Sequence, residues 1–234
     1  MTMRPLAVVT GVGPGTGSAV VRRFHEGGYR VVMLARDATR LSVLHEELPD
    51  TIAVSCDVTD SARLLAALDE IVAEFGGPKV VVHNAVGGAF GSFAEVEPAR
   101  LERNFQVNVM ALLHLARWAS PLMEAAGEGA MPCTGNTSAL RGKVRIAGFA
   151  PTKAAQRILA ESIAREVGPK GIHVSYLLID AVIDVPWARK RYADKPDDFF
   201  IQPAAIADEA WHVVHQLRSA RSFLTEVRPF KETW

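Results

Sequence analysis

The stretch T-G-V-G-P-G-T-G, from Thr10 to Gly17, decides the fold of this chain. It follows the apolar run LAVVT at residues 6–10 and precedes SAVVRRFHEGG, whose apolar residues recur at helical spacing. Four glycines within seven residues let the backbone approach a ligand, and a helix N-terminus points free N–H groups at phosphate oxygens. The stretch therefore predicts a strand, a phosphate-binding turn and a helix. The alternative is a flexible turn without a ligand.

The spacing of the glycines indicates which of them serve the turn. The pattern G-x-G-x-x-G fails, because its last glycine would fall on Thr16. The pattern T-G-x-x-x-G-x-G fits, with Gly11, Gly15 and Gly17 in the glycine positions. We expect these three glycines, together with Thr16, to bind the diphosphate of a dinucleotide.

Short apolar runs continue after this turn and alternate with amphipathic helical stretches. Their continuous apolar character is typical of strands buried on both faces of a parallel sheet. The runs lie at residues 6–10, 29–34, 51–56, 79–83, 130–134, 172–179 and 222–227. We predict an α/β fold with one Rossmann-type, doubly wound parallel sheet of about seven strands flanked by helices. We expect it to form a single domain over residues 1–234.

The composition of the chain narrows the classes of partner. Twenty-six basic and 26 acidic side chains give a formal net charge of zero, so we expect neither nucleic acid nor a membrane as partner. No apolar run approaches the roughly 18 residues of a membrane span. The two cysteines, Cys56 and Cys133, form no metal-ligand spacing and no disulfide framework. We therefore expect no metal site, and the cytoplasm as the compartment.

Three further motifs follow the glycine turn: C-D-V at residues 56–58, H-N-A-V-G-G at residues 83–88, and Asn108 within an otherwise apolar helix. Together with the turn, they resemble the short-chain dehydrogenase/reductase superfamily along nearly the whole chain. The resemblance implies that Asp57, Val58, Asn84 and Ala85 bind the cofactor, with the Asp57 carboxylate accepting a hydrogen bond from the adenine amino group. It also implies that Asn108 supports the active site through a backbone kink. Taken singly, Asp57 could be a helix cap and Asn108 a satisfied core amide.

The residues at the tip of the second strand discriminate between NADP and NAD. An acidic side chain there binds the ribose 2′-hydroxyl of NAD, whereas an arginine accommodates the 2′-phosphate of NADP. Here Ala35 occupies the tip and Arg36 follows it. A guanidinium binds phosphate with paired, charge-assisted hydrogen bonds. We therefore predict NADP as the cofactor, with Arg36 on its 2′-phosphate. NAD remains the alternative, because Asp37 could turn into the ribose site.

The resemblance also implies an active site built on Y-x-x-x-K and an upstream serine. In the family the tyrosine exchanges a proton with the substrate, the lysine lowers the tyrosine pKa and holds the nicotinamide ribose, and the serine polarises the substrate oxygen. Here Lys153 is present, but Phe149 stands at the tyrosine position and has no proton to transfer. For the serine position we favour Ser138, with Thr137 second, while the family's commonest spacing falls on Asn136.

The other motifs also depart from the family pattern. After the sixth strand the family shows P-G-x-I-x-T, and D-A-V-I-D-V at residues 180–185 keeps only Ile183, which we expect to contact the cofactor. The stretches T-G-N-T-S-A-L-R-G, G-P-K-G-I-H-V and V-R-P-F-K-E-T-W resemble a branch of bacterial short-chain dehydrogenases in which phenylalanine also replaces the tyrosine. We interpret the chain as a member of this variant branch.

Two functions from different classes follow from these residues. The first is an NADP-dependent short-chain oxidoreductase acting on a small carbonyl or alcohol, because losing one general acid costs about 10²–10⁴-fold in rate and not all activity. Its proton could come from water, from Ser138 or Thr137, or from Asp180. The second is an NADP-binding regulatory or scaffold protein without turnover. Residues 184–203 are predicted to form a substrate lid, and the resemblance implies a homodimer or homotetramer.

Overall fold

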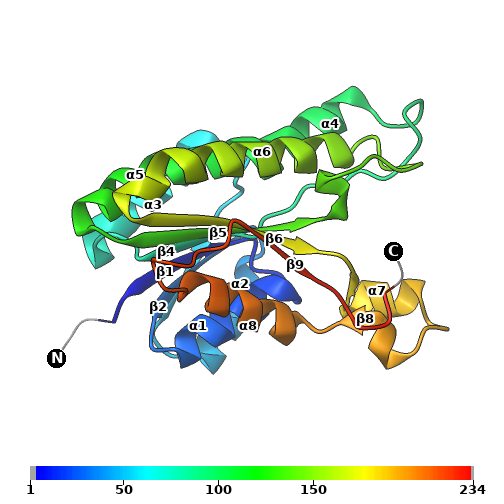
Figure 1. Cartoon of the computed structure of the whole chain (residues 1–234). Helices are drawn as coiled ribbons and strands as arrows, with labels where there is room; N and C mark the ends of the chain where they lie inside the picture. Colours follow the sequence, from blue (N-terminus) through cyan, green and yellow to red (C-terminus); the bar gives the residue numbers. More distant parts are fainter. Residues whose placement is uncertain (1–3, 233–234) are drawn as a thin grey trace.

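The computed structural model describes residues 4–232, so the last two residues of V-R-P-F-K-E-T-W lie outside the described part of the chain. Within that part, one sheet of seven parallel strands runs in the order β3-β2-β1-β4-β5-β6-β9 (Figure 1). The strands are β1 (Leu6–Thr10), β2 (Arg30–Ala35), β3 (Thr51–Ser55), β4 (Val80–His83), β5 (Gly129–Asn136), β6 (Ile172–Ile179) and β9 (Leu224–Val227). The predicted α/β fold with a parallel sheet of about seven strands is confirmed.

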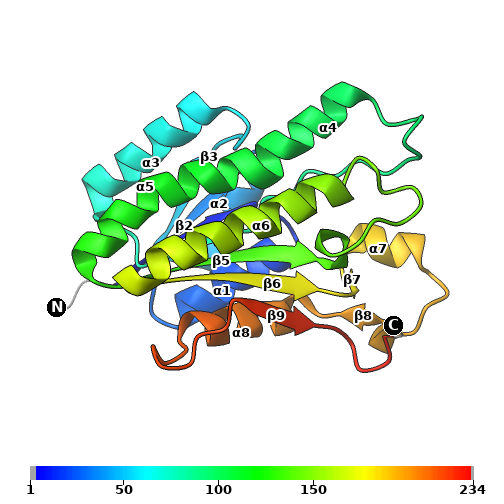
Figure 2. The same cartoon turned by 45° about the horizontal axis from the view of Figure 1, so that its top comes forward.

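Helices cover both faces of this sheet (Figures 1 and 2). One face carries α3 (Ser61–Phe75), α4 (Pro98–Phe105), α5 (Ala111–Ala126) and α6 (Ala150–Val167). The other carries α1 (Thr16–Glu26), α2 (Ala38–Glu47) and α8 (Pro203–Val214). In the described part of the chain, no helix is both long and apolar enough to cross a bilayer.

The two layers of helices explain why the inner strands are mostly apolar. Successive side chains of a strand point to opposite faces of a sheet. Val8 and Val32 therefore belong to the core under α3, α5 and α6, whereas Val9 and Val31 belong to the core over α1, α2 and α8. Every residue of the inner strands β1, β4 and β6 is buried, so these strands show no regular alternation of polar and apolar residues, whereas the edge strands β3 and β9 are partly exposed.

The helix predicted to contain Asn108 is divided into three pieces. After α4, the backbone forms a π-helical turn, η1 (Gln106–Met110), before it continues as α5. Such π-turns concentrate at functional sites. The turn contains the fully buried Asn108, so the backbone departs from regular α-helix where the family resemblance predicts a kink.

Residues 184–203, predicted as a lid, form a small module beyond the carboxyl ends of the strands (Figure 2). The module contains α7 (Pro186–Arg191), the 3₁₀ turn η4 (Asp197–Phe199) and β8 (Phe200–Ile201). Strand β8 pairs in parallel with β7 (Val182–Ile183), which follows β6. Val185, Ala188 and Phe200 form a separate apolar cluster inside the module.

The strand order reverses at β1, which lies between β2 and β4. The connections from β1 and from β4 therefore leave toward opposite faces of the sheet, and a crevice opens beyond their carboxyl ends. The turn from Thr10 to Gly17 follows β1, and Asn84 and Ala85 follow β4. The fold thus brings the sequence motifs to one place.

Candidate cofactor and active site

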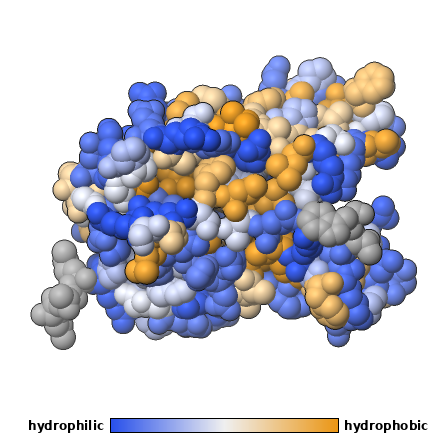
Figure 3. Space-filling model, in the orientation of Figure 1, coloured by the Kyte–Doolittle hydropathy of each residue, from blue (hydrophilic) through white to orange (hydrophobic). Residues whose placement is uncertain are grey.

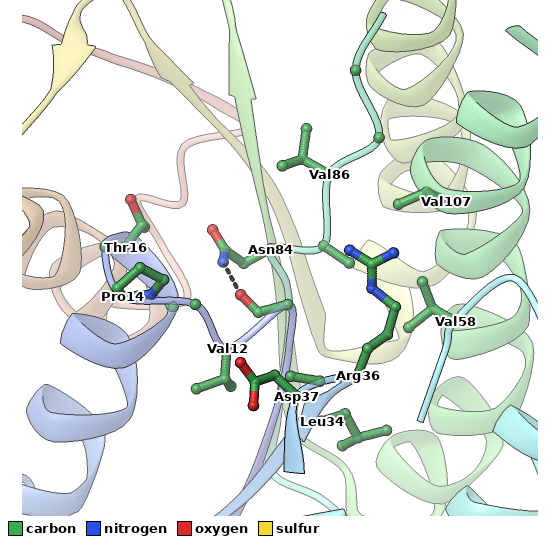
Figure 4. Close-up of a pocket in the computed structure, with 18 of the residues that line it drawn as sticks. Val12, Pro14, Thr16, Leu34, Arg36, Asp37, Val58, Asn84, Val86 and Val107 are labelled. Carbon is green, nitrogen blue, oxygen red and sulfur yellow. Dashed lines mark hydrogen bonds between the residues drawn. The ribbon is translucent and has the colours of Figure 1, made fainter. Parts of the chain in front are cut away.

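A cavity of about 1040 Å³ lies at this crevice (Figure 4). Every predicted cofactor-binding residue except Lys153 contributes to its wall: Gly11, Gly15, Thr16, Gly17, Arg36, Asp57, Val58, Asn84, Ala85 and Ile183. Arg100, Arg103, Val185 and Trp187, which the sequence did not single out as cofactor residues, line it as well. A dinucleotide is an extended ligand, and the cavity reaches from the lid module to the tip of β2.

Of the four glycines in the turn, the three of the motif have no room for a side chain. A Cβ atom on Gly11 would lie 2.4 Å from the Ala85 Cα, and its φ of +72° is one that side chains other than glycine rarely adopt. A Cβ on Gly15 would lie 2.6 Å from the Val185 Cγ1, and one on Gly17 would lie 2.4 Å from the Gly11 carbonyl oxygen. A Cβ on Gly13 would meet nothing within 4 Å. The packing therefore supports the T-G-x-x-x-G-x-G frame.

The N-terminus of α1 fits a diphosphate. The helix begins at Thr16 and has no side-chain cap, and Thr16 and Gly17 line the cavity. Their N–H groups are therefore available to a ligand, whereas the Ser18 N–H already donates to the Gly13 carbonyl at 3.1 Å. The Thr16 hydroxyl is buried and has no hydrogen-bond partner among the described residues. An unpaired buried hydroxyl is unfavourable, and a phosphate oxygen beside it would satisfy it.

The loops around the turn are held by a chain of side-chain hydrogen bonds. The Asn84 amide nitrogen donates to the Gly11 carbonyl at 2.8 Å, which Figure 4 shows as a dashed line. The Thr134 hydroxyl in turn donates to the Asn84 amide oxygen at 3.0 Å. Asn84 therefore ties the ends of β1 and β4 together, and β5 holds Asn84.

At the tip of β2, the two candidates for cofactor selectivity behave differently. Arg36 extends into the cavity (Figure 4), and its guanidinium has no ion pair within residues 4–232. Asp37 caps α2 by accepting a hydrogen bond from the Arg40 backbone N–H at 3.0 Å, and it forms an ion pair with the Arg40 guanidinium at 3.2 Å. The carboxylate that would favour NAD is thus engaged by its own helix.

Asp57 is bound on both carboxylate oxygens. One accepts hydrogen bonds from the Thr59 backbone and hydroxyl, and the other accepts one from the Arg103 guanidinium at 2.8 Å. Burial alone would raise the pKa of Asp57, but the hydrogen bonds from Thr59 and Arg103 outweigh it and lower this pKa. An adenine amino group bound by Asp57 has to share the carboxylate with Arg103. The sequence carries no signal for this pair, because its partners lie 46 residues apart.

Asn108 connects three segments of the predicted active site. Its side chain accepts a hydrogen bond from the Gly87 N–H and donates one to the Gly87 carbonyl, both at 2.9 Å. It also donates to the Thr152 hydroxyl on α6 at 2.8 Å. All the polar atoms of a buried amide are satisfied in this way. Asn108 therefore fixes the loop after β4 against the start of α6.

Lys153 is buried and does not line the cavity. Its amine donates to the Thr134 carbonyl at 3.0 Å and to the side-chain oxygen of Gln156. Burial lowers the pKa of Lys153 to about 8, because removal from water disfavours the charged amine. The sequence did not predict Gln156 as a partner of this lysine.

The tyrosine position holds an apolar ring. Phe149 is buried at the start of α6, and its ring centroid lies 5.5 Å from that of Phe90. Tyr176, fully buried in β6, turns its hydroxyl toward the Lys153 carbonyl and the Gln156 side chain, each at 3.4 Å. Burial raises the pKa of Tyr176 far above its usual value. Tyr176 is thus held inside the core and does not line the cavity.

The three candidates for the serine position lie at the end of β5. Asn136 caps the 3₁₀ turn η2 (Thr137–Ala139) by accepting a hydrogen bond from the Ser138 N–H at 3.1 Å. This cap gives Asn136 a structural role. Thr137 and Ser138 are half-buried in the turn, which packs against α6. That Thr137 or Ser138 takes the role of the family's serine stays a prediction.

Arg189 organises the lid module, and the sequence did not reveal this role. Its guanidinium forms two 2.6 Å hydrogen bonds with Asp184, a third of 2.6 Å with Asp197, and lies over the Phe200 ring at 4.1 Å. Hydrogen bonding to Arg189 lowers the pKa of Asp184 to about 2. Val185 follows Asp184 and reaches the Gly15 backbone, so this clamp sets the position of the cavity wall.

Comparisons with known proteins agree with this site. The family model described as short chain dehydrogenase matches residues 5–195. The chain is 27% identical over 181 residues to the 7alpha-hydroxysteroid dehydrogenase of Escherichia coli K12, covering 76% of this chain and 71% of that protein. It is 32% identical over 170 residues to the D-erythrulose reductase of Gallus gallus, covering 72% of this chain and 68% of that protein.

A solved structure agrees as well. A metagenomic short-chain oxidoreductase in complex with NADP superposes with a TM-score of 0.85 at 26% identity, covering 97% of this chain and 98% of that one. The match of the family model to most of the sequence agrees with the sheet order and with the placement of the glycine turn at the switch point. The chain therefore belongs to the short-chain dehydrogenase family.

Proposed function

We propose that the chain binds NADP and transfers hydride between this cofactor and a small carbonyl or alcohol, with an atypical active site. One observation carries the proposal: the cavity wall combines the crowded motif glycines, the uncapped N-terminus of α1 and the unpaired Arg36 guanidinium. The first two features suit a diphosphate and the third suits a 2′-phosphate. NADP has both groups.

The relatives support this proposal. The metagenomic oxidoreductase was solved with NADP, and the two curated relatives are named for the oxidation of a hydroxysteroid and the reduction of a sugar. The hydrogen bond and ion pair between Asp37 and Arg40 also support NADP over NAD. The Asp37 carboxylate, which would bind the ribose hydroxyls of NAD, is already bonded to Arg40.

The residues of the chain have distinct roles in this mechanism. Bound NADPH supplies the hydride that a carbonyl carbon accepts. The amides at the start of α1 and the Thr16 hydroxyl bind the diphosphate, while Ile183 and Val185 exclude water on the lid side. Ser138 or Thr137 donates a hydrogen bond to the substrate oxygen. The oxygen takes its proton from water or through one of these hydroxyls, because the ring of Phe149 carries none.

Titrating the protein with NADPH and NADH by calorimetry tests the cofactor assignment. We expect NADPH to bind at least about tenfold more tightly, since charge-assisted hydrogen bonds contribute about 1.5–3 kcal/mol. Arg36→Ala abolishes this preference, whereas Arg117→Ala, on the exposed face of α5 outside the cavity, leaves it unchanged. Tighter binding of NADH, or no response to either nucleotide at millimolar concentration, would overturn the assignment.

Turnover is tested by restoring the missing hydroxyl. Phe149→Tyr increases kcat/KM for NADPH-dependent reduction by about 10²–10⁴-fold if only the general acid is missing. Phe223→Tyr, directly before β9, adds the same hydroxyl outside the site and changes nothing. If NADPH binds but neither the parent nor Phe149→Tyr consumes it with a broad panel of aldehydes and ketones, the oxidoreductase proposal is wrong. That outcome supports an NADP-binding regulatory or scaffold protein.

Four further predictions belong to this proposal. We propose that residues 1–234 form a single cofactor-binding domain and that residues 184–203 act as its substrate lid. A homodimer or homotetramer is proposed from the family resemblance. A reducing compartment such as the cytoplasm is proposed because Cys56 and Cys133 are both buried and unpaired.

A further inference from the structure

Large exposed apolar side chains gather around the mouth of the cavity. We define an apolar rim by five of them: Val86, Phe90, Phe93, Val144 and Trp187. Their exposed fractions are 63%, 74%, 88%, 89% and 66%, in that order. They come from three segments at the carboxyl edge of the sheet, and Figure 3 shows apolar side chains, interspersed with hydrophilic ones, over the loops at its upper right. Several large exposed apolar side chains beside one cavity are a recurrent feature of ligand-binding sites.

Two of the three segments that carry the rim are held together. The Gly91 N–H donates to the Arg145 carbonyl at 2.9 Å, and Gly91 forms a parallel bridge with Ile146. The Arg145 guanidinium also forms an ion pair with Glu95 at 3.5 Å. The loop after β4 and the loop after η2 therefore form one surface before any ligand binds.

The rim is continuous with the cofactor cavity. Val86, in the loop after β4, and Trp187, on α7, both line the cavity itself. The Phe90 ring contacts the Phe149 ring, and a Cβ on Gly88 would lie 3.7 and 3.8 Å from these two rings. Phe149 stands where the family places its proton donor, so the rim extends outward from the predicted reaction centre.

From this surface we infer the substrate class: a bulky apolar ketone or secondary alcohol, whose ring system or chain lies on the rim. The inference rests on the proposed function. A sugar-like polyol would lose hydrogen bonds to water against Phe90, Phe93 and Val144 without replacement, whereas an apolar ring system gains from leaving water. Arg141 and Lys143, in the loop of Val144, have no ion pair within residues 4–232, which disfavours a cationic substrate.

The test compares two ketones on the NADP-loaded protein. The probes are 2-decalone, an apolar fused bicycle, and erythrulose, a small polyol, and binding is followed by calorimetry so that no turnover is needed. We expect 2-decalone to bind at least about tenfold more tightly than erythrulose. Phe90→Ser and Phe93→Ser each weaken 2-decalone binding by about fivefold or more and leave NADP affinity unchanged.

Leu217→Ser is the matched control. Leu217 is 76% exposed and lies in the loop before β9, at the amino edge of the sheet, so its replacement leaves 2-decalone binding unchanged. Equal or tighter binding of erythrulose, or Phe90→Ser and Phe93→Ser variants that bind 2-decalone as the parent does, overturns the inference.

Three other outcomes have separate meanings. If NADP fails to bind the parent protein, the proposed function is overturned and the inference with it; NADP binding without a ketone preference overturns the inference alone. If Phe93→Ser converts an oligomer into a monomer in sedimentation without affecting ketone binding, the rim is an interface between copies of the chain, and the substrate inference is wrong.

Discussion

Gly15 is the position where a single methyl group gives the sharpest test of the cofactor cavity. The Cβ introduced by Gly15→Ala would lie 2.6 Å from the Val185 Cγ1. Two carbon atoms in ordinary contact lie about 3.5–4.0 Å apart. The methyl group therefore displaces Val185, and with it the lid side of the cavity, by about 1 Å.

The size of the effect follows from the packing around Val185. Val185 is buried in the small core of the lid module, which the Arg189 clamp holds, so it cannot turn away freely. Overpacking of this kind costs about 1–3 kcal/mol. If the free protein relieves the overlap by moving the lid outward, NADPH binding has to reverse that movement. The dissociation constant then rises by about 10- to 100-fold.

The assay is NADPH titration by calorimetry or by nucleotide fluorescence, with the melting temperature as a check on folding. Gly13→Ala is the matched control, because its Cβ meets nothing within 4 Å, and it changes the dissociation constant by less than about threefold. Val185→Ala removes the methyl group that Gly15→Ala would strike. The double variant Gly15→Ala/Val185→Ala should therefore bind NADPH nearly as tightly as Val185→Ala alone.

Two results would refute this reasoning. If Gly15→Ala binds NADPH as the parent does while Gly13→Ala weakens binding, the glycine frame is misassigned. If Val185→Ala fails to relieve the effect of Gly15→Ala, the contact between turn and lid does not determine binding.

Three further predictions concern the lid, a buried amine and a helix cap. Arg189→Met removes the clamp and raises the NADPH dissociation constant by about tenfold, whereas Arg191→Met, an exposed neighbour on α7, leaves it unchanged; equal effects in calorimetry would contradict the clamp. Because the pKa of Lys153 falls from 10.5 to about 8 on folding, its contribution to stability is fully present above pH 10.5 and is lost as the pH falls through 8. The unfolding free energy of the parent relative to Lys153→Met therefore rises by up to about 3 kcal/mol between those pH values in urea denaturation, and a flat difference would contradict the burial. Asp60→Ala removes the cap of α3 and lowers the unfolding free energy by about 1 kcal/mol, whereas Asp69→Ala, an exposed acid within α3, changes it little.

The strands could be predicted because their signal is local. The apolar run at residues 172–179 has the same bounds as β6. The match is exact because every residue from Ile172 to Ile179 is buried, so burial and strand pairing end at the same residues. The strand at 130–134 was predicted too short. In the structure β5 continues to Asn136, because the backbone of Gly135 and Asn136 pairs with β6. Pairing with a neighbour extends a strand beyond its apolar residues.

The partners of the buried polar residues could not be predicted in the same way. Tyr176 occupies space that exists because Gly135 on the neighbouring strand has no side chain: a Cβ there would lie 2.0 Å from the Tyr176 ring. The hydroxyl of Tyr176 then meets Gln156, which also accepts a hydrogen bond from the Lys153 amine. No pattern along the chain relates these residues.

By itself, the sequence determined the glycine frame, the apolar strands and hence the sheet with its switch point, because each depends on spacing within a few residues. Only the tertiary structure decided which charged side chains form ion pairs within the protein. Asp57 pairs with Arg103 and Asp184 pairs with Arg189, whereas Arg36 remains available to a ligand. The physical reason is that an ion pair depends on distance in space. The carboxyl edge of the sheet brings together side chains from β2, β3, α4 and the lid that the chain keeps far apart.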